Sequence, residues 1–175
     1  MAKIIIFSGA GISAESGIST FRDADGFWEN FKIENICSAD SMQCNRKETI
    51  NFYDNRRLEI KNKKPNKAHI KLKEIQDKYP NDIKIITQNV DDLFEKAECN
   101  NVLHLHGFLT QIYCEKCEFK EDIGYKKQND AYKFCPKCKT DALRPNIVFF
   151  GEAAPKYKNM FKEFDTCEML VVIGT

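Results

Sequence analysis

Several features that would assign this chain to a common class of protein are absent from its sequence. No run of about 18 apolar residues occurs among the 175, so the sequence predicts no membrane span. The first apolar run, residues 4–7, is short and lacks the small-residue cleavage site of a secretory signal. Internal repeats and low-complexity tracts are lacking too. We therefore expect a cytoplasmic protein without a membrane partner.

A clear excess of charge of one sign is also missing. Lys and Arg total 27 against 26 Asp and Glu, which gives a formal net charge of +1. A protein that binds nucleic acid usually carries a marked basic excess, so we expect no nucleic-acid partner. The basic stretch at residues 56–67 is typical of a solvated face.

Cysteine, by contrast, is plentiful, and half of the eight cysteines are paired. Two C-x2-C pairs stand 17 residues apart, at Cys114, Cys117, Cys135 and Cys138. This spacing predicts a four-thiolate zinc site, and metal binding is favoured over disulfides where no secretory signal is present. Because the thiolates fill all four positions, the zinc is expected to be structural. The remaining cysteines are predicted to be small buried hydrophobic residues: Cys37, Cys44, Cys99 and Cys167.

Short apolar runs alternate with helical patterns along the chain, which predicts an α/β domain with a doubly wound parallel sheet. The expected strands are residues 3–8, 83–87, 102–105, 147–150 and 169–173, and the expected helices include 48–60 and 68–78. We expect a single domain over 1–175 with two insertions, because two intervals are longer than a simple crossover needs. The insertions are a helical module at 30–80 and the zinc-binding module at 111–143.

A glycine-rich turn follows the first predicted strand. Gly9, Gly11 and Ala14 match the G-x-G-x-x-A pattern that lets a pyrophosphate approach the backbone at a helix N-terminus. Such turns also serve tight packing between a strand and a helix. No acidic ribose ligand is identifiable about 20 residues further on, which counts against an ordinary nicotinamide dehydrogenase.

Polar residues stand at the carboxyl ends of the second and third predicted strands, where open α/β sheets bind ligands. The segment 88–92 carries amides and carboxylates that suit sugar hydroxyls, although it could equally cap the helix that follows. His104 and His106 are expected to share one face of the third strand. A neutral histidine there can be a general base near pH 7, or it can be structural.

Together these stretches resemble the sirtuin family. The matching segments are GAGISAESGISTFRDADGFW (9–28), TQNVDDL (87–93), LHG (105–107), both C-x2-C pairs, RPNIVFFGE (144–152) and the final GT. The resemblance implies a Rossmann-like fold and an enzyme that removes acyl groups from lysine side chains of proteins or peptides. It further implies that NAD is consumed as a co-substrate, with release of nicotinamide and O-acyl-ADP-ribose.

The resemblance also implies a role for individual residues. His106 would be the base, with Asn89 and Asp91 beside it in the catalytic group. A segment that pairs with a substrate peptide as an added strand corresponds to Val148, Phe149, Gly151 and Glu152. The residues implied to bind NAD are Gly9, Ala10, Gly11, Ile12, Ser13, Glu15, Phe21, Arg22, Trp28, Gln88, Asn89, Val90, Asp91, His106, Gly174 and Thr175.

One further match concerns the acyl group. Tyr53 and Arg56 resemble the Tyr-x-x-Arg signature of sirtuins that accept acidic acyl groups. One helical turn apart, a hydroxyl and a guanidinium can bind a distal carboxylate together. The alternative is an aromatic core contact beside a solvated arginine. We therefore expect a desuccinylase and demalonylase that also removes acetyl groups.

Other functions remain open from the sequence: a plain lysine deacetylase, a sirtuin-like ADP-ribosyltransferase, and a non-catalytic fragment that binds a peptide or partner. The last depends on the end of the chain. The sequence stops at Thr175, directly after an apolar run, whereas sirtuins continue with residues that hold the adenine half of NAD. We accordingly expect a chain that is shortened at its C-terminus and binds NAD weakly.

Overall fold

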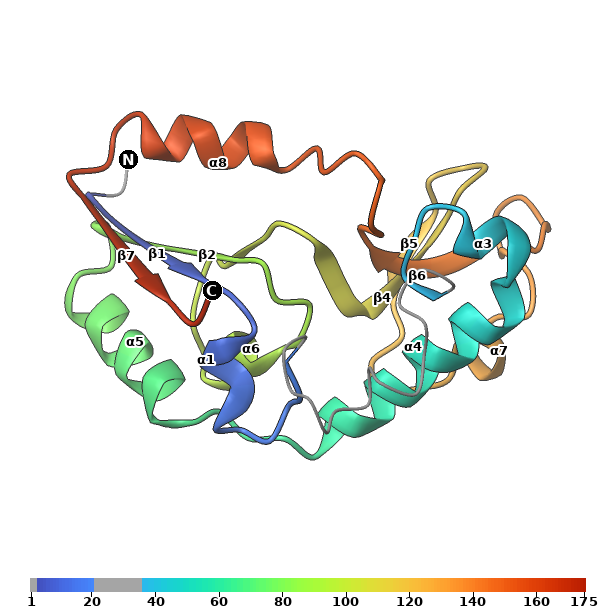
Figure 1. Ribbon diagram of the computed structural model, residues 1–175, viewed down its shortest axis with the longest axis horizontal. Coiled ribbons are helices and arrows are strands. Elements are labelled where there is room, and N and C mark those ends of the chain that lie inside the picture. The colour runs from blue at the N-terminus through green and yellow to red at the C-terminus, as the bar shows by residue number, and fades with distance from the viewer. Residues whose placement is uncertain (1–2, 21–35) are drawn as a thin grey trace.

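The computed structural model describes residues 3–20 and 36–175, and its described part contains two sheets (Figure 1). The larger sheet has the strand order β3-β2-β1-β7, and all three pairings are parallel. Its strands are β1 (Ile4–Ser8), β2 (Ile83–Thr87), β3 (Leu103–His104) and β7 (Met169–Ile173). This arrangement confirms the predicted α/β class with a parallel sheet.

The apolar sequence of β1 and β2 explains why these central strands are largely buried on both faces of the sheet, whereas Met169, Leu170 and Val172 of the edge strand β7 are exposed. Alternate side chains of β1 point to opposite sides, so Ile5 packs with Met160 while Ile6 packs with Leu72. Met160 belongs to α8 (Tyr157–Phe164), and Leu72 belongs to α5 (Lys67–Lys78). The two helices therefore cover opposite faces of the sheet (Figure 1).

A second, antiparallel sheet corrects one of the predicted strands. Its order is β5-β4-β6, formed by β4 (Gly107–Cys114), β5 (Lys120–Asp122) and β6 (Leu143–Ile147). The apolar run at 147–150 was expected to be a strand of the parallel sheet, but β6 ends at Ile147 and pairs with β4. The run is apolar because Ile147 and Phe149 pack in the core beneath α4 (Arg46–Lys61).

The long helices form where the sequence predicts them. The expected helix at 48–60 lies within α4, and that at 68–78 lies within α5. Asn66 caps α5 because its Oδ1 accepts from the N–H of Ala68 at 2.9 Å. Shorter helices are α1 (Gly11–Ala14), α3 (Ser41–Cys44), α6 (Leu93–Lys96) and α7 (Gln128–Ala131). Among the described helices, none has the length and apolar character to cross a bilayer.

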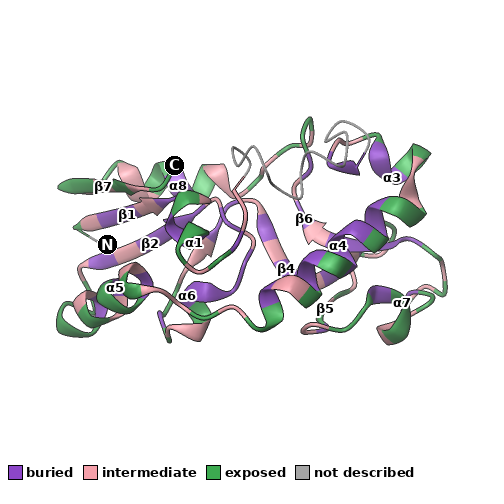
Figure 2. Cartoon of the chain, turned by 60° about the horizontal axis from the view of Figure 1, so that its bottom comes forward, coloured by how far each residue is buried: buried purple, intermediate pink, exposed green. Residues whose placement is uncertain are grey.

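Buried polar contacts attach α4 to the antiparallel sheet and its loops. Arg57 is fully buried, and its Nε donates to the carbonyl of Leu109 at 2.8 Å. The same guanidinium is paired with Asp54, which also accepts from the N–H of Gln128 at 2.9 Å. Figure 2 shows the alternation of buried and exposed residues along this helix. Because Arg57 points into this interface, neighbouring side chains of α4 face elsewhere.

Candidate active site

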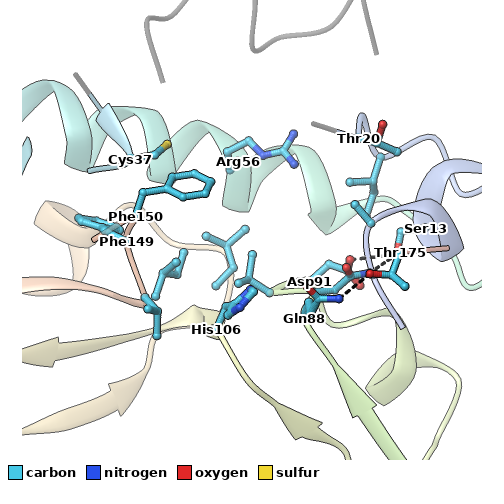
Figure 3. Close-up of a pocket in the computed structure, with 18 of the residues that line it drawn as sticks. Ser13, Thr20, Cys37, Arg56, Gln88, Asp91, His106, Phe149, Phe150 and Thr175 are labelled. Carbon is cyan, nitrogen blue, oxygen red and sulfur yellow. Dashed lines mark hydrogen bonds between the residues drawn. The ribbon is translucent and has the colours of Figure 1, made fainter. Parts of the chain in front are cut away.

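A cavity of about 760 Å³ lies between the carboxyl edge of the parallel sheet and α4 (Figure 3). Its size is within the usual range for ligand sites. The structure brings most of the predicted site residues to its wall: Gly9, Ala10, Gly11, Ser13, Tyr53, Arg56, Gln88, Asn89, Val90, Asp91, His106, Val148, Phe149, Gly151, Glu152, Gly174 and Thr175.

Two of the described residues predicted to bind the nucleotide, Ile12 and Glu15, are not among those that line the cavity. Ile12 is buried in the core against the parallel sheet, and Glu15 is exposed on the surface. Their places follow from the helical turn, because Ser13 between them takes the position that faces the cavity. Phe21, Arg22 and Trp28 lie outside the described residues.

The glycine-rich turn packs tightly against the end of β7. A Cβ on Gly9 would lie 2.9 Å from the carbonyl oxygen of Gly174, and one on Gly11 would lie 2.8 Å from the Cα of Gly174. The N–H of Gly11 donates to that carbonyl at 2.7 Å, and the N–H of Gly9 donates to Ile173 at 3.2 Å. The glycines therefore serve the strand-to-helix packing, and by doing so they bring Gly174 and Thr175 to the cavity wall.

A chain of hydrogen bonds at the cavity joins α1 to the segment that follows β2. The amide of Asn89 donates to Ser13 Oγ at 3.0 Å, and that hydroxyl donates to Asp91 Oδ2 at 3.0 Å. Asp91 Oδ1 accepts from the N–H of Leu93, the first residue of α6, at 3.1 Å. Burial raises the pKa of Asp91, and its hydrogen bonds oppose that shift. Asp91 thus both lines the cavity and binds the first N–H of α6.

The two strand-end histidines do not share one face, as the sequence analysis expected. β3 ends at His104, so the two-residue alternation does not continue to His106. His104 is buried away from the cavity, with Nδ1 2.8 Å from the carbonyl oxygen of Asn89 and Nε2 2.9 Å from Glu95. His106 faces the cavity, and its Nε2 lies 3.0 Å from the hydroxyl of Tyr157. Burial lowers the pKa of His106, while a hydrogen bond with the backbone of Gln88 opposes this shift.

Tyr53 and Arg56 both line the cavity from α4. The ring of Tyr53 stacks on Phe149 with centroids 5.4 Å apart, and its hydroxyl donates to Cys37 Sγ at 3.4 Å. Arg56 forms an ion pair with Glu59, with 2.6 Å between Nη1 and Oε2. The guanidinium of Arg56 points over the cavity in Figure 3. Both side chains therefore reach the cavity, although Tyr53 already has a partner in Cys37 and Arg56 has one in Glu59.

An ion pair organises the segment that follows β6. Arg144 is buried, and its guanidinium lies 4.0 Å from the centroid of the Phe149 ring. Glu152 accepts from Arg144 at 2.5 and 3.0 Å and from the N–H of Phe149 at 2.8 Å. The carboxylate of Glu152 is thus committed within the protein, and Arg144 holds the Phe149 ring on which Tyr53 stacks.

Several residues of the cavity wall were not expected from the sequence to belong to the site, among them Tyr157 and Cys37. Tyr157, at the start of α8, lies 51 positions from His106, and no local pattern connects the two. Cys37 was expected to be a buried hydrophobic residue; it is buried, and it also lines the cavity. Cys99 is buried as expected, whereas Cys44 is exposed at the end of α3 and Cys167 is half-buried.

The four paired cysteines come together beside the antiparallel sheet. Their Sγ atoms all lie within 4.8 Å of one another, and the distances Cys114–Cys138 and Cys117–Cys135 are both 3.5 Å. A tetrahedral zinc with Zn–S bonds of about 2.3 Å separates its sulfurs by about 3.8 Å. The thiols therefore fit a zinc ion, and none of them belongs to the cavity wall.

Comparison with known proteins gives a consistent result. The model of the Sir2 family matches residues 9–175. A protein of Campylobacter jejuni named NAD-dependent protein deacylase is 47% identical over 100% of this chain and 74% of its own length. A protein of Helicobacter pylori with the same name is 42% identical, with the same coverage of both chains.

Solved structures are similar over almost the whole chain. A Sir2 homologue in complex with NAD has a TM-score of 0.87 at 34% identity, covering 98% of this chain and 67% of that one. A Sir2 homologue in complex with ADP-ribose has a TM-score of 0.89 at 33% identity, covering 98% and 69%. A Sir2 protein with a deacetylated peptide and 3'-O-acetyl ADP-ribose has a TM-score of 0.82 at 28% identity, covering 98% and 71%.

Proposed function

Because this chain belongs to the Sir2 family, we propose that it is an NAD-dependent protein-lysine deacylase. One observation carries the proposal: a single cavity brings the Asn89–Ser13–Asp91 chain of hydrogen bonds within reach of His106. Similar proteins that are named deacylases, and similar structures that hold NAD or ADP-ribose, support it.

The residues of the cavity wall suit the ribose and amide of NAD. The side chains of Gln88, Asn89 and Asp91 offer both hydrogen-bond donors and acceptors, which a nicotinamide amide and ribose hydroxyls need. When bound, NAD supplies an electrophilic ribose carbon, because nicotinamide is a good leaving group. Asn89 is held by Ser13, so its amide is already oriented before a ligand arrives.

His106 is the proposed general base. Burial lowers its pKa below the ordinary value of about 6.5, so the imidazole is neutral at pH 7 and can accept a proton. Its Nε2 faces the cavity side on which Tyr157 lies. The proposed role of His106 is to take the proton of a ribose hydroxyl as that oxygen bonds to the acyl carbon.

Tyr53 and Arg56 are the proposed recognition pair for a succinyl or malonyl group. Both side chains reach the cavity, and a guanidinium can form a charge-assisted hydrogen bond with a carboxylate. Arg56 is buried and Glu59 is half-buried, so an acyl carboxylate in the cavity would have to take the place of Glu59 as the partner of this guanidinium. A substrate without a distal carboxylate, such as acetyl-lysine, gains nothing from this exchange.

The segment 148–152 is the proposed docking edge for the substrate peptide. Its N–H groups are largely committed: Val148 donates to His106, Phe149 to Glu152, and Phe150 to Cys37. The carbonyls of Phe149 and Phe150 also accept, from the N–H groups of Glu152 and Ala39, so a peptide added here as a strand would donate its own N–H groups mainly to the carbonyls of Val148 and Gly151.

A nicotinamide-release assay tests the proposal. The chain is incubated with NAD and matched peptides carrying acetyl-, malonyl-, succinyl- or unmodified lysine, and the products are identified by mass spectrometry. We expect release that depends on an acylated lysine, together with O-acyl-ADP-ribose, and highest with the acidic acyl groups. ADP-ribose transferred to protein without loss of the acyl group would instead support a transferase. Absence of nicotinamide release with all peptides would contradict the proposal.

A further inference from the structure

A tyrosine hydroxyl forms a hydrogen bond with the cavity-facing nitrogen of His106. The hydroxyl of Tyr157 lies 3.0 Å from Nε2 of His106, and the two rings are nearly parallel, with an angle of 26° and 6.0 Å between centroids. Both side chains line the cavity. Tyr157 is held in place by the start of α8, where its N–H donates to Ala154 at 3.1 Å, and by Phe161 one turn further on.

The direction of this hydrogen bond follows from the other nitrogen of the ring. The backbone of Gln88 favours the protonated form of His106, as a carbonyl does when it lies near a ring N–H. Since Nε2 faces Tyr157, the nitrogen on the Gln88 side of the ring is Nδ1. In the neutral ring Nδ1 then carries the proton and Nε2 carries the lone pair. The tyrosine hydroxyl is therefore the donor.

We propose that Tyr157 is a positioning residue for the base: its hydroxyl holds Nε2 of His106 as an acceptor in the cavity until a substrate hydroxyl takes its place. This inference deepens the proposed deacylase function and rests on it for the identity of the substrate hydroxyl. The contact between the two side chains does not depend on that function.

The other ionisable groups around His106 have partners of their own. On the described cavity wall they are Arg56 with Glu59, Tyr53 with Cys37, Asp91 with Ser13, and Glu152 with Arg144. Close to Tyr157 and His106 along the chain, Lys156 donates to the carbonyl of His104, and the ring of His104 lies against Asn89 and Glu95. Tyr157 is the ionisable side chain for which the structure gives a direct hydrogen bond to the His106 ring. A change at Tyr157 therefore acts on His106 without breaking one of these pairs.

Removing the hydroxyl makes a definite change in the titration of His106. The Tyr157 hydroxyl stabilises the neutral imidazole because it donates to the lone pair, and this favours loss of the ring proton. In Tyr157→Phe the neutral form loses that bond, so the pKa of His106 rises, by about 0.5–1 unit for one neutral hydrogen bond.

The chain is well suited to measuring this shift, because it contains only three histidines. Imidazole resonances are assigned in the wild-type chain and followed by NMR from pH 4 to 8, together with the nitrogen shifts that report the tautomer. Tyr132→Phe is the matched control, because it removes a hydroxyl that bonds to Glu121 in the other part of the molecule. We expect Nδ1 to be protonated in the neutral ring and the pKa to rise in Tyr157→Phe alone. An unchanged pKa in Tyr157→Phe, or a proton on Nε2 in the wild type, would overturn the inference.

A kinetic measurement separates this inference from the proposed function. In a deacylase, the acid limb of kcat/KM against pH should move upward in Tyr157→Phe by the same amount as the NMR pKa, with the rate largely retained above it. A loss that is equal at every pH would mean that the tyrosine only supports the fold, and it would overturn the inference. If neither the wild type nor the variant releases nicotinamide, the deacylase proposal fails. The NMR titration of His106 still decides the role of Tyr157.

Discussion

His104 and His106 show how much two positions in a chain can differ in surroundings. His104 is enclosed, with both ring nitrogens next to oxygen atoms of Asn89 and Glu95. His106 faces a cavity through a nitrogen whose present partner is a single hydroxyl. Only the second arrangement leaves a lone pair that a substrate proton can reach. The contacts of the two residues therefore identify His104 as structural and leave His106 as the proposed base.

His106→Ala should therefore abolish deacylation without unfolding the protein. The loss of a general base typically lowers the rate by about 100- to 10,000-fold. Steady-state rates with the best acyl peptide measure the loss, and circular dichroism and zinc content check the fold. His104→Gln is the control, since glutamine can still donate to the carbonyl of Asn89. Near-normal turnover in His106→Ala, or the same loss in a well-folded His104→Gln, would contradict the assignment of the base.

Arg56→Met should reduce the preference for acidic acyl groups. A charge-assisted hydrogen bond contributes about 1.5–3 kcal/mol, so KM for succinyl-lysine should rise roughly 10- to 150-fold. Acetyl-lysine has no distal carboxylate, and its KM should change far less. Lys47→Met serves as a control because Lys47 is exposed on the same helix and does not line the cavity. Equal losses on both substrates would show that Arg56 only supports α4.

At the scale of elements, a polar contact joins the start of α5 to α1, the helix that follows the glycine-rich turn. Asn66 donates to the carbonyl of Ile12 at 2.7 Å, while its Oδ1 accepts from Ala68 and lies 3.1 Å from Nδ1 of His69. His69 is fully buried, packs edge-on against Phe94, and its Nε2 has no partner among the described residues. The helix therefore encloses a histidine that must stay neutral.

This histidine makes stability depend on pH. Burial lowers the pKa of His69 to about 4, whereas an unfolded histidine titrates near 6.5. Between these values the unfolded chain binds more protons than the folded one, so the free energy of unfolding falls as pH drops from about 6.5 toward 4. His69→Leu removes this contribution, so its free energy of unfolding should not share this part of the fall with pH. The amount by which the wild type is more stable than the variant should therefore shrink by about 1–2 kcal/mol between pH 7 and pH 5.

Urea denaturation of both proteins at several pH values measures that difference. Groups common to the two chains, such as the buried carboxyls of Asp54 and Asp91, cancel in the comparison. A deficit that stays constant from pH 7 to pH 5 would show that His69 does not titrate as the structure indicates.

For the whole molecule, the proposed acyl pocket depends on contacts between α4 and the part that holds the cysteines. Arg46 donates to the carbonyl of Leu143 at 2.8 Å, and Gln128 donates to the same carbonyl at 2.9 Å. Leu143 is the first residue of β6 and packs with the cysteines in one buried cluster. Loss of order around the cysteines is therefore transmitted to the helix that carries Tyr53 and Arg56.

One zinc ion per chain is expected, held by Cys114, Cys117, Cys135 and Cys138. Because such an ion contributes directly to folding, chelation or Cys135→Ser should unfold the segment around it and lower activity indirectly. Metal analysis of freshly purified protein and circular dichroism before and after chelation measure both effects. Cys44→Ser, at an exposed and unclustered cysteine, should leave the zinc content unchanged. Protein without zinc, or with full zinc in Cys135→Ser, would contradict the site.

Local sequence determined a large part of this molecule. The four strands of the parallel sheet and the two long helices follow from short apolar runs and from periodicity, which depend on neighbouring residues. The cysteine cluster follows from spacing, because each C-x2-C turn brings two sulfurs together without help from the rest of the chain. The order of motifs was sufficient to identify the family, as the match over residues 9–175 confirms.

Other features were decided only by tertiary structure. The run at 147–150 lies outside the parallel sheet, because Ile147 ends β6 and packs with Phe149 under α4. The two histidines have different surroundings because β3 ends at His104. The contact between Tyr157 and His106 joins positions 51 residues apart, and no periodic pattern spans that distance. Periodicity determines which side chains are buried, whereas the partner that each buried or cavity-facing group meets depends on how distant elements pack together.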